Sequence, residues 1–283
     1  MKLKDIQIKF HNELDVIYPS EEVDSFFFIL IDFYHQISRL KLAMNLDLEI
    51  ENSKNVLEAL ELLKKEMPIQ YITGETEFFG LTFKVNESVL IPRPETEELV
   101  HWVVKSNKNQ KIKIIDIGTG SGCIAISIAK KMPNASVYGI DVSKDALKVA
   151  KQNADLNHVN VNFIEADILT FQNNNFNIEP SFDIIISNPP YVREQEKELM
   201  SLNVLNNEPH LALFVKDENP LLFYNMITDF AKHNLNDNGQ LFFEINEYLG
   251  RDMIELLTDK NFKNIQLKQD LFKKDRMIKA TIN

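Results

Sequence analysis

The sequence predicts an α/β protein, in which a small α-helical bundle and a β-hairpin linker precede a mostly parallel β-sheet. From residue 111 onward, strand-like and helix-like segments alternate along the chain. The strand-like segments are nearly continuous apolar runs, such as Ile184–Ile186, which is typical of parallel strands covered on both faces. Glycine is scarce, with 8 in 283 residues, yet three lie between residues 118 and 122, where the first of these strands gives way to a helix. This clustering indicates a turn that needs bare backbone.

The composition is that of a folded globular protein. Hydrophobic residues make up 44% and charged residues 26% of the chain, which excludes disorder and a disulfide-built mini-fold. The formal net charge of −11 argues against a protein that grips long phosphate backbones, so we expect no direct nucleic-acid partner. One cysteine and six scattered histidines give no zinc-type spacing, so we expect no metal site. Without a signal-peptide pattern or an apolar run long enough for a bilayer, we expect a cytoplasmic protein with no membrane partner.

Residues 1–68 are predicted to be helical, because apolar residues recur every three or four positions in two segments. These positions are Phe26, Ile29, Leu30, Phe33, Ile37 and Leu40, and then Val56, Leu57, Leu60 and Leu63. Ser20 is a candidate N-cap, and Pro68 prevents the last helix from continuing. We interpret the stretch as a separate bundle; the alternative is that its helices extend the main core.

Residues 69–95 are predicted to be a linker built around a β-hairpin. Gly74 and Gly80 punctuate a strand-like stretch rich in phenylalanine and valine. Two prolines then hold the chain extended, and Glu95 or Thr96 opens a helix.

Residues 96–283 are predicted to form the α/β domain. Strands are expected at 111–117, 136–141, 161–167, 182–188, 239–245, 262–270 and 276–282, with one of the last two antiparallel. Helices are expected at 121–132, 143–156, 193–205 and 221–235. The asparagine-rich stretch Asn173–Asn177 is expected to be a loop.

A ligand-binding loop is predicted at the end of the first strand of this domain. Gly118 and Gly120 permit a tight turn and close approach of a ligand, and Gly122 permits close packing. Asp141 ends the second strand, 19 residues after Gly122, where a carboxylate can accept hydrogen bonds from two ribose hydroxyls. Asp167 ends the third strand, where an acidic side chain can meet an adenine amino group.

The spacing of this loop narrows the choice of ligand. A dinucleotide site normally has Gly-x-Gly-x-x-Gly, whereas this chain has Gly-x-Gly-x-Gly, and no lysine follows that would indicate a P-loop. The spacing resembles that of class I S-adenosylmethionine-dependent methyltransferases, in which the loop cradles the methionine part of the cofactor. A nicotinamide cofactor and a tight turn without any ligand remain as alternatives.

A second motif, Asn188-Pro189-Pro190-Tyr191, ends the fourth strand at the same edge of the sheet. The amide oxygen of Asn188 and a proline carbonyl can accept the two hydrogens of an –NH₂ group, and Tyr191 offers a flat face to a planar group. Accepting both hydrogens favours a pyramidal nitrogen whose lone pair points at a methyl donor. Alignment of this kind can be worth up to ~7–11 kcal/mol. A rigid turn is the alternative for a Pro-Pro-Tyr sequence.

The flanking sequence resembles one family of amino-methylating enzymes. Asn-Pro-Pro-Tyr is shared by DNA adenine, some RNA guanine and protein glutamine methyltransferases. The segments Gln70–Gly80, Val89–Glu97 and Glu208–Phe214 resemble the linker, the catalytic-domain entry and the Glu-Pro-x-x-Ala-Leu segment of the PrmC/HemK family. The chain is therefore identified, over about residues 69–283, as a member of these release factor glutamine methyltransferases.

The resemblance implies a Rossmann-like class I methyltransferase domain with seven strands, mostly parallel and one antiparallel. It implies S-adenosylmethionine as cofactor and, as substrate, the glutamine of the Gly-Gly-Gln motif in peptide chain release factors. The implied cofactor-binding residues are Gly118, Thr119, Gly120, Ser121, Gly122, Asp141, Asp167, Ile168 and Asn188. The implied catalytic and substrate-binding residues are Asn188, Pro189, Pro190 and Tyr191, with Phe79 as a wall of the glutamine pocket. The helices of residues 1–68 would contact the release factor.

Two other functions remain open at this point. A nucleic-acid amino-methyltransferase should carry a basic groove or a target-recognition domain, and the net charge of −11 speaks against it. A non-catalytic scaffold would tolerate damage at Asn188 or Tyr191, and both are intact. The chain departs from the family pattern at Val215–Pro220, where glycines are common, and at Asn246, where a glycine commonly stands. These departures concern the shape of local loops.

Overall fold

The computed structural model describes residues 1–107, 111–171 and 181–282, and its contacts group the chain into two compact units. The first comprises Met1–Gly74 and Ser201–Asn207, and the second comprises Glu75–Met200 and Glu208–Asn283. The division falls inside the predicted linker and joins a short segment after residue 200 to the N-terminal helices. The predicted loop at Asn173–Asn177 lies outside the described residues.

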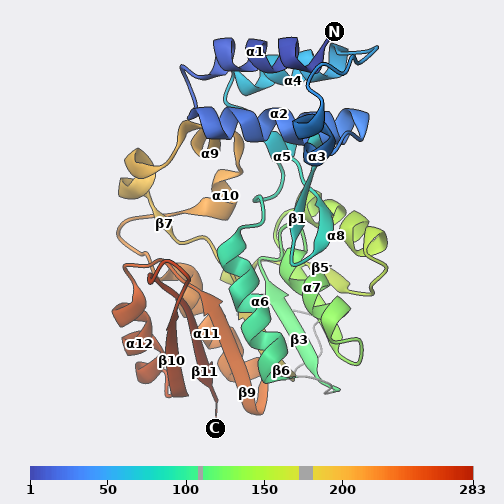
Figure 1. Cartoon of the computed structure of the whole chain (residues 1–283). Coiled ribbons are helices and arrows are strands. Elements are labelled where there is room, and N and C mark those ends of the chain that lie inside the picture. The colour runs from blue at the N-terminus through green and yellow to red at the C-terminus, as the bar shows by residue number, and fades with distance from the viewer. Residues whose placement is uncertain (108–110, 172–180, 283) are drawn as a thin grey trace. The chain divides into compact units, whose positions relative to one another are not determined.

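The first unit is helical, as the sequence predicts (Figure 1). Its helices are α1 (Leu3–Leu14), α2 (Ser20–His35), α3 (Arg39–Met44), α4 (Lys54–Leu63), α5 (Ile69–Thr73) and α9 (Leu202–Asn207). Pro68 lies at the N-cap of α5, so it separates this helix from α4. The prediction for Ser20 is wrong, because α2 begins at Ser20 itself and Pro19 lies at the N-cap.

The core of this unit uses a different face of α2 from the one that the periodicity predicts. Phe26 and Leu30 are buried, but Ile29 and Phe33 are exposed, and Phe27 takes their place in the core. The run from residue 26 to residue 31 is apolar all round, so its spacing does not select a face. Packing of α2 against α1 and α4 selects it, and Phe27 meets Phe10 of α1 edge to face at 5.8 Å.

The second unit opens with the predicted hairpin, formed by β1 (Glu75–Phe78) and β2 (Leu81–Lys84). The turn consists of Phe79 and Gly80, whose φ angles are 53° and 72°. Two consecutive positive φ angles match the twist of a two-residue hairpin. Phe78 and Phe83 are buried, so the hairpin packs into the core of this unit. Helix α6 (Pro94–Ser106) follows and begins at Pro94, one residue before the predicted start.

A seven-stranded sheet forms the centre of the second unit (Figure 1). Its strands are β3 (Lys113–Ile117), β4 (Ser136–Asp141), β5 (Asn162–Glu165), β6 (Phe182–Ser187), β9 (Leu235–Glu244), β10 (Lys263–Gln269) and β11 (Asp275–Thr281). They lie in the order β10-β11-β9-β6-β3-β4-β5, and β11 is antiparallel to both of its neighbours. The prediction of a seven-stranded, mostly parallel sheet with one antiparallel strand is confirmed.

Helices cover both faces of this sheet, because its strands are apolar on both sides. Ile114 and Ile184 pack on one face, against α6, α7 (Cys123–Lys131) and α8 (Lys144–Leu156). Ile115 and Ile185, their neighbours in sequence, pack on the other face, against α11 (Leu222–Asn234) and α12 (Gly250–Asp259). Alternate residues of each strand therefore enter two separate cores.

The segment after β6 differs from the single helix predicted at 193–205. It consists of β7 (Val192–Arg193), the 3-10 helix η2 (Glu194–Leu199) and α9, with Met200 extended between the two helices. The prediction is wrong because η2 stays with the second unit, whereas α9 belongs to the first. Past α9, the chain forms α10 (His210–Leu213) and β8 (Phe214–Val215), which pairs with β7.

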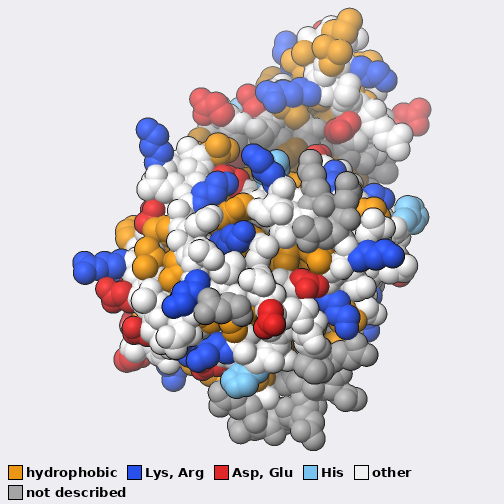
Figure 2. Space-filling model, turned by 90° about the horizontal axis from the view of Figure 1, so that it is seen from below, with side chains coloured by type: hydrophobic (Ala, Val, Ile, Leu, Met, Phe, Trp, Pro, Cys, Tyr) orange, Lys and Arg blue, Asp and Glu red, His pale blue; other side chains and the backbone are white. Residues whose placement is uncertain are grey.

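Charged side chains of both signs share the surface. On the face turned to the reader in Figure 2, lysine and arginine side chains are interspersed with acidic and apolar ones. Within the described parts of the chain, no helix is both long enough and apolar enough to cross a membrane.

Candidate functional site

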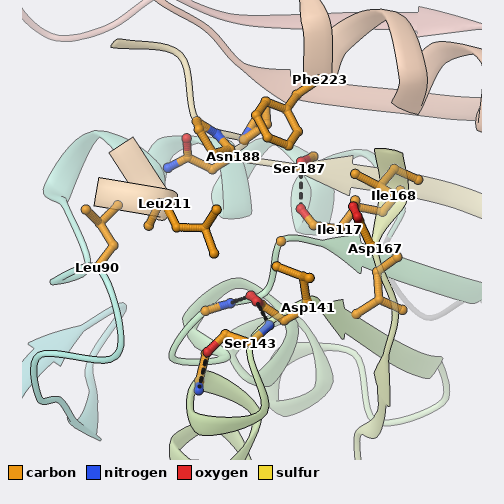
Figure 3. Close-up of a pocket in the computed structure, with 18 of the residues that line it drawn as sticks. Leu90, Ile117, Asp141, Ser143, Asp167, Ile168, Ser187, Asn188, Leu211 and Phe223 are labelled. Carbon is orange, nitrogen blue, oxygen red and sulfur yellow. Dashed lines mark hydrogen bonds between the residues drawn. The ribbon is translucent and has the colours of Figure 1, made fainter. Parts of the chain in front are cut away.

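A cavity of about 160 Å³ opens at the carboxyl edge of the sheet, where β3, β4, β5 and β6 end (Figure 3). The chain winds outward from β3 through β4 and β5 in one direction and from β6 through β9 in the other. This is a topological switch point, where open α/β sheets bind their ligands. The cavity is lined by Ser88, Val89, Leu90, Ile117, Gly118, Gly120, Ile140, Asp141, Val142, Ser143, Ala146, Ala166, Asp167, Ile168, Ser187, Asn188, Pro189, Pro190, Pro209, Leu211, Ala212, Phe223 and Ile227.

The predicted glycine loop presents its backbone to this cavity. Gly118 and Gly120 have φ angles of 74° and 53°, and a Cβ atom on either would meet no heavy atom within 4 Å. The left-handed backbone therefore favours glycine here, and the space beside it is open to a ligand. The backbone N–H groups of Gly118 and Thr119 both donate to the Ile140 carbonyl at 2.9 Å, and the Thr119 hydroxyl donates to Asp116 at 2.6 Å. These bonds fix the loop.

Asp141 joins the glycine loop to the start of α8. Its Oδ2 accepts from the backbone N–H of Gly120 at 2.8 Å, and its Oδ1 accepts from that of Ser143 at 2.9 Å. Burial raises the pKa of Asp141, and these backbone hydrogen bonds oppose that rise. A carboxylate has about four acceptor positions, so these backbone hydrogen bonds leave acceptor capacity for a ligand. Two adjacent acceptors suit the two hydroxyls of a ribose.

Asp167 and Ile168 lie at the end of the cavity away from Leu90 (Figure 3). The Asp167 carboxylate accepts from the backbone N–H of Leu169 at 2.9 Å and caps the 3-10 helix η1 (Ile168–Thr170). The side chain of Ile168 is buried. An acceptor beside an apolar wall suits a planar heterocycle that carries an amino group.

Asn188 lies across the cavity from Asp141 (Figure 3). The residue before it, Ser187, donates its hydroxyl to the Ile117 carbonyl at 2.6 Å, which ties the end of β6 to the end of β3. Pro189 and Pro190 follow and also line the cavity, and neither has a backbone N–H. The amide of Asn188 and the carbonyls of this turn thus form a group of acceptors near the glycine loop.

Some predicted site residues do not line the cavity. Tyr191 packs beside the core of the α11 face, and its hydroxyl donates to Glu244 at 3.0 Å. Phe79 lies in the hairpin turn, with the Lys131 ammonium 5.5 Å from its ring centroid. Gly122 lies behind the loop: a Cβ there would come within 2.8 Å of Ile126 and 3.2 Å of Ala150. Thr119 and Ser121 are buried within the loop, outside the lining.

Two rim segments of the cavity were not assigned a role from the sequence. The first segment, Ser88–Leu90, and the second, Pro209, Leu211 and Ala212, contribute mostly apolar side chains, and Glu208 links the two segments. Glu208 is buried, accepts from the backbone N–H of Ile91 at 3.1 Å, and pairs with the Arg93 guanidinium. Family resemblance marks both segments through their Glu-Pro and Ile-Pro-Arg-Pro sequences. The contact between them could not be predicted, because it joins residues more than a hundred positions apart.

The two departures from the family pattern have local partners. Asn246 donates from its Nδ2 to the Tyr191 carbonyl at 3.2 Å and to Glu196 at 3.0 Å. The segment after β8 returns through Asp217, which accepts from the backbone N–H of Gln195 at 3.1 Å. Both departures therefore fasten the segment around β7 and η2 without lining the cavity.

Two further titratable groups lie beneath the glycine loop. Burial raises the pKa of Asp116 to about 7, with the negative charge of Asp141 adding to the rise and the hydrogen bond from Thr119 opposing it. Burial likewise raises the pKa of the Cys123 thiol to about 12. A thiol with such a pKa is inert at neutral pH, which favours a packing role for Cys123.

Across the described ranges, no group of three or more His, Cys, Asp or Glu residues could hold a metal ion.

Comparison with known proteins first gives the class. A family model described as "Methyltransferase domain" matches residues 108–271. The fold is shared with a methyltransferase from Pyrococcus furiosus, with a TM-score of 0.53 over 80% of this chain and 95% of that chain at 16% identity. The protein is a class I methyltransferase, and such enzymes use S-adenosylmethionine.

Relatives then give the particular family. The chain is 53% identical, over 99% of both chains, to the release factor glutamine methyltransferase of Flavobacterium psychrophilum. It is 42% identical to the one of Bacteroides thetaiotaomicron, over 94% of this chain and 95% of that relative. The chain belongs to the release factor glutamine methyltransferase family.

Proposed function

We propose that this protein transfers a methyl group from S-adenosylmethionine to the side-chain amide nitrogen of the glutamine in the Gly-Gly-Gln motif of a peptide chain release factor. The observation that carries this proposal is the cavity at the switch point, which brings the glycine loop, Asp141 and Asn188 within one site. The first two match parts of the cofactor, and the third matches the amide that is methylated.

The cofactor fits the residues of the cavity part by part. The open backbone of Gly118 and Gly120 would receive the methionine portion, and the remaining acceptor capacity of the Asp141 carboxylate would receive the ribose hydroxyls. Asp167 and Ile168 would border the adenine. Thr119, Ser121 and Gly122 would serve by holding the loop in shape, since they lie outside the lining.

The chemistry needs positioning more than acid or base catalysis. When bound, S-adenosylmethionine supplies an electrophilic methyl group on a sulfonium. The Asn188 amide oxygen and a carbonyl of Pro189 or Pro190 would accept the two N–H hydrogens of the glutamine amide. This removes the nitrogen lone pair from conjugation and directs it at the methyl group. As the methyl group leaves the sulfonium and bonds to nitrogen, the nitrogen must give up one N–H proton, which solvent can accept. Alignment of this kind can be worth up to ~7–11 kcal/mol.

Two substrate-binding residues remain predictions that the cavity does not include. Tyr191 would have to present its ring from the turn after Pro190, and Phe79 would have to reach the glutamine from the hairpin. Tyr191 can also act on the site indirectly, because its hydroxyl donates a hydrogen bond to Glu244.

The helical first unit is our candidate for release-factor recognition. A pocket around one amide reads only a small planar group, so selectivity has to come from contacts farther away. The first unit exposes apolar side chains on α2 and α3, including Ile29, Phe33, Leu40 and Met44. Such side chains can bury apolar area against a protein partner. We place the activity in the cytoplasm, where release factors work.

This assignment predicts a difference between short and intact substrates. In the full chain, Leu40→Glu combined with Met44→Glu should lower kcat/KM on intact release factor about tenfold or more. The same variant should leave kcat/KM on a short Gly-Gly-Gln peptide within about twofold, since the peptide has no remote surface. Equal losses on both substrates would contradict the recognition role.

The reaction itself is tested by one incubation with labelled S-adenosylmethionine. Intact release factor should gain one methyl group on the motif glutamine, located by peptide mass spectrometry. Release factor with that glutamine replaced by alanine should gain none. DNA and RNA included as separate substrates test the alternative of a nucleic-acid methyltransferase, which the net charge of −11 disfavours. Label on nucleic acid and none on protein would overturn the proposal.

A further inference from the structure

Two buried polar residues stand behind Asn188, outside the cavity lining. Thr96 lies in the first turn of α6 and is 2% exposed. Glu244 is the last residue of β9 and is 1% exposed. A buried carboxylate is costly unless hydrogen bonds satisfy it, so its partners are informative.

The partners form a chain that ends at Asn188. The Thr96 hydroxyl donates to Glu244 Oε2 at 2.6 Å, and the Tyr191 hydroxyl donates to Glu244 Oε1 at 3.0 Å. The Asn188 Nδ2 lies 3.3 Å from Thr96 Oγ1 and donates to it. Both oxygens of Glu244 are thus engaged by hydroxyl groups from different elements.

The environment of Glu244 is that of an acceptor. Burial raises the pKa of Glu244, while the hydrogen bonds from Thr96 and Tyr191 and the positive charge of Arg276 lower it, and Glu95 adds a small rise. Arg276 is itself held, with its Nε donating to Asp270 at 3.1 Å. The pKa of Glu244 stays raised overall, but each of its oxygens has an O–H donor aimed at it, so in this geometry both oxygens accept hydrogen bonds.

The consequence for Asn188 follows from counting hydrogens. A hydroxyl has one hydrogen, and Thr96 gives it to Glu244. Thr96 can then only accept from Asn188, so the NH₂ of that amide must face Thr96. The other atom of the amide, Oδ1, is left to accept from a ligand in the cavity. In the reversed orientation, two N–H donors would oppose each other at the substrate.

We propose that Thr96 is a positioning residue for methyl transfer, held by Glu244, which fixes the Asn188 amide so that its oxygen faces the glutamine –NH₂. This inference rests on the proposed function, because it assumes that Asn188 receives the glutamine amide. Tyr191 would help to hold Glu244 in place, because its hydroxyl donates to the second oxygen of that carboxylate.

The first test removes the Thr96 hydroxyl while keeping the shape of the side chain. Thr96→Val should lower kcat on release factor about five- to tenfold, the factor that one neutral hydrogen bond is worth. The dissociation constant for S-adenosylmethionine should stay within about twofold. Thr96→Ser keeps the hydroxyl and should restore most of kcat. An unchanged kcat in Thr96→Val would overturn the proposal.

A double-mutant cycle separates positioning from a merely structural role. Asn188→Ala should lower kcat by ~10²–10³, as loss of one well-placed electrostatic group does. Adding Thr96→Val to Asn188→Ala should change kcat by less than twofold, because the group that Thr96 orients is already gone. The same five- to tenfold loss in both backgrounds would show that Thr96 acts elsewhere, and would overturn the inference.

A matched control and a fallback variant keep the experiment decisive. Thr228 is also fully buried, but its hydroxyl donates to the Tyr224 carbonyl of its own helix, so Thr228→Val should leave kcat within about twofold. If Thr96→Val does not fold, the same cycle with Glu244→Gln applies, because the carboxamide has one acceptor oxygen for two donors. Additive losses in that cycle also overturn the inference. A wild-type protein that fails to methylate release factor, or an unaffected Asn188→Ala variant, would instead refute the proposed function.

Discussion

The sharpest prediction for cofactor binding concerns Asp141. In Asp141→Asn, one carboxylate oxygen becomes an NH₂ group, which must face the backbone N–H of either Gly120 or Ser143. Two donors then oppose each other, and at least one charged hydrogen bond to the ribose is lost. Each such bond is worth ~1.5–3 kcal/mol. The dissociation constant for S-adenosylmethionine should therefore rise roughly 10- to 150-fold, and Asp141→Ala should raise it at least tenfold.

Isothermal titration calorimetry measures this effect directly. Asp145→Asn is the matched control, because it removes the same charge in the first turn of α8 from a fully exposed side chain that pairs with Lys148. That variant should bind the cofactor within about twofold of the wild type. The reasoning about Asp141 fails if its asparagine variant is folded, by circular dichroism, and binds as tightly as the control.

The remaining predictions concern stability. Because burial raises the pKa of Asp116 to about 7, the folded chain keeps a proton that the unfolded chain releases above its ordinary pKa near 4. The free energy of unfolding of the wild type, relative to Asp116→Asn, should fall as pH rises from about 4 to 7, by up to about 4 kcal/mol; parallel curves from urea melts would contradict this. Glu208→Gln should lower the free energy of unfolding by ~1–3 kcal/mol, because Arg93 loses its buried counter-charge. Arg93→Met added to Glu208→Gln should recover part of that loss, because no unpaired charge then remains. Urea melts of the four proteins test this, and additive losses would show that the two residues act independently.

The sheet could be predicted because the apolar pattern of each strand shows which of its faces are buried. Runs such as Ile184–Ile186 have no polar face, and only a strand covered on both sides needs none. The direction of β11 was within reach as well, because its strand follows β10 after a short turn. The helix predicted at 193–205 failed because its parts pack in different units, which no local pattern encodes.

The ligand-facing residues of the candidate site were predictable for a similar reason. Gly118, Asp141 and Asn188 each end a strand, and parallel strands bring their carboxyl ends to one edge. The residues behind them were not, because Thr96 meets Asn188 across 92 positions and Glu244 across 148. Contacts at such separation depend on how α6 crosses the sheet, and the sequence has no short-range sign of that.

The three glycines of the loop are needed for different reasons, two for ligand binding and one for packing as well. Gly118 and Gly120 have room for a Cβ on the protein side, so an asparagine there would strain the backbone by only ~1–2 kcal/mol. Gly122 has less freedom, because a Cβ would come within 2.8 Å of Ile126 and 3.2 Å of Ala150 as well as require a φ of 81°. A descendant that had abandoned methyl transfer would therefore be expected to lose the first two glycines and keep the third. A related sequence that keeps the glycine at position 122 but has lost those at 118 and 120 would thus be expected to lack methyltransferase activity.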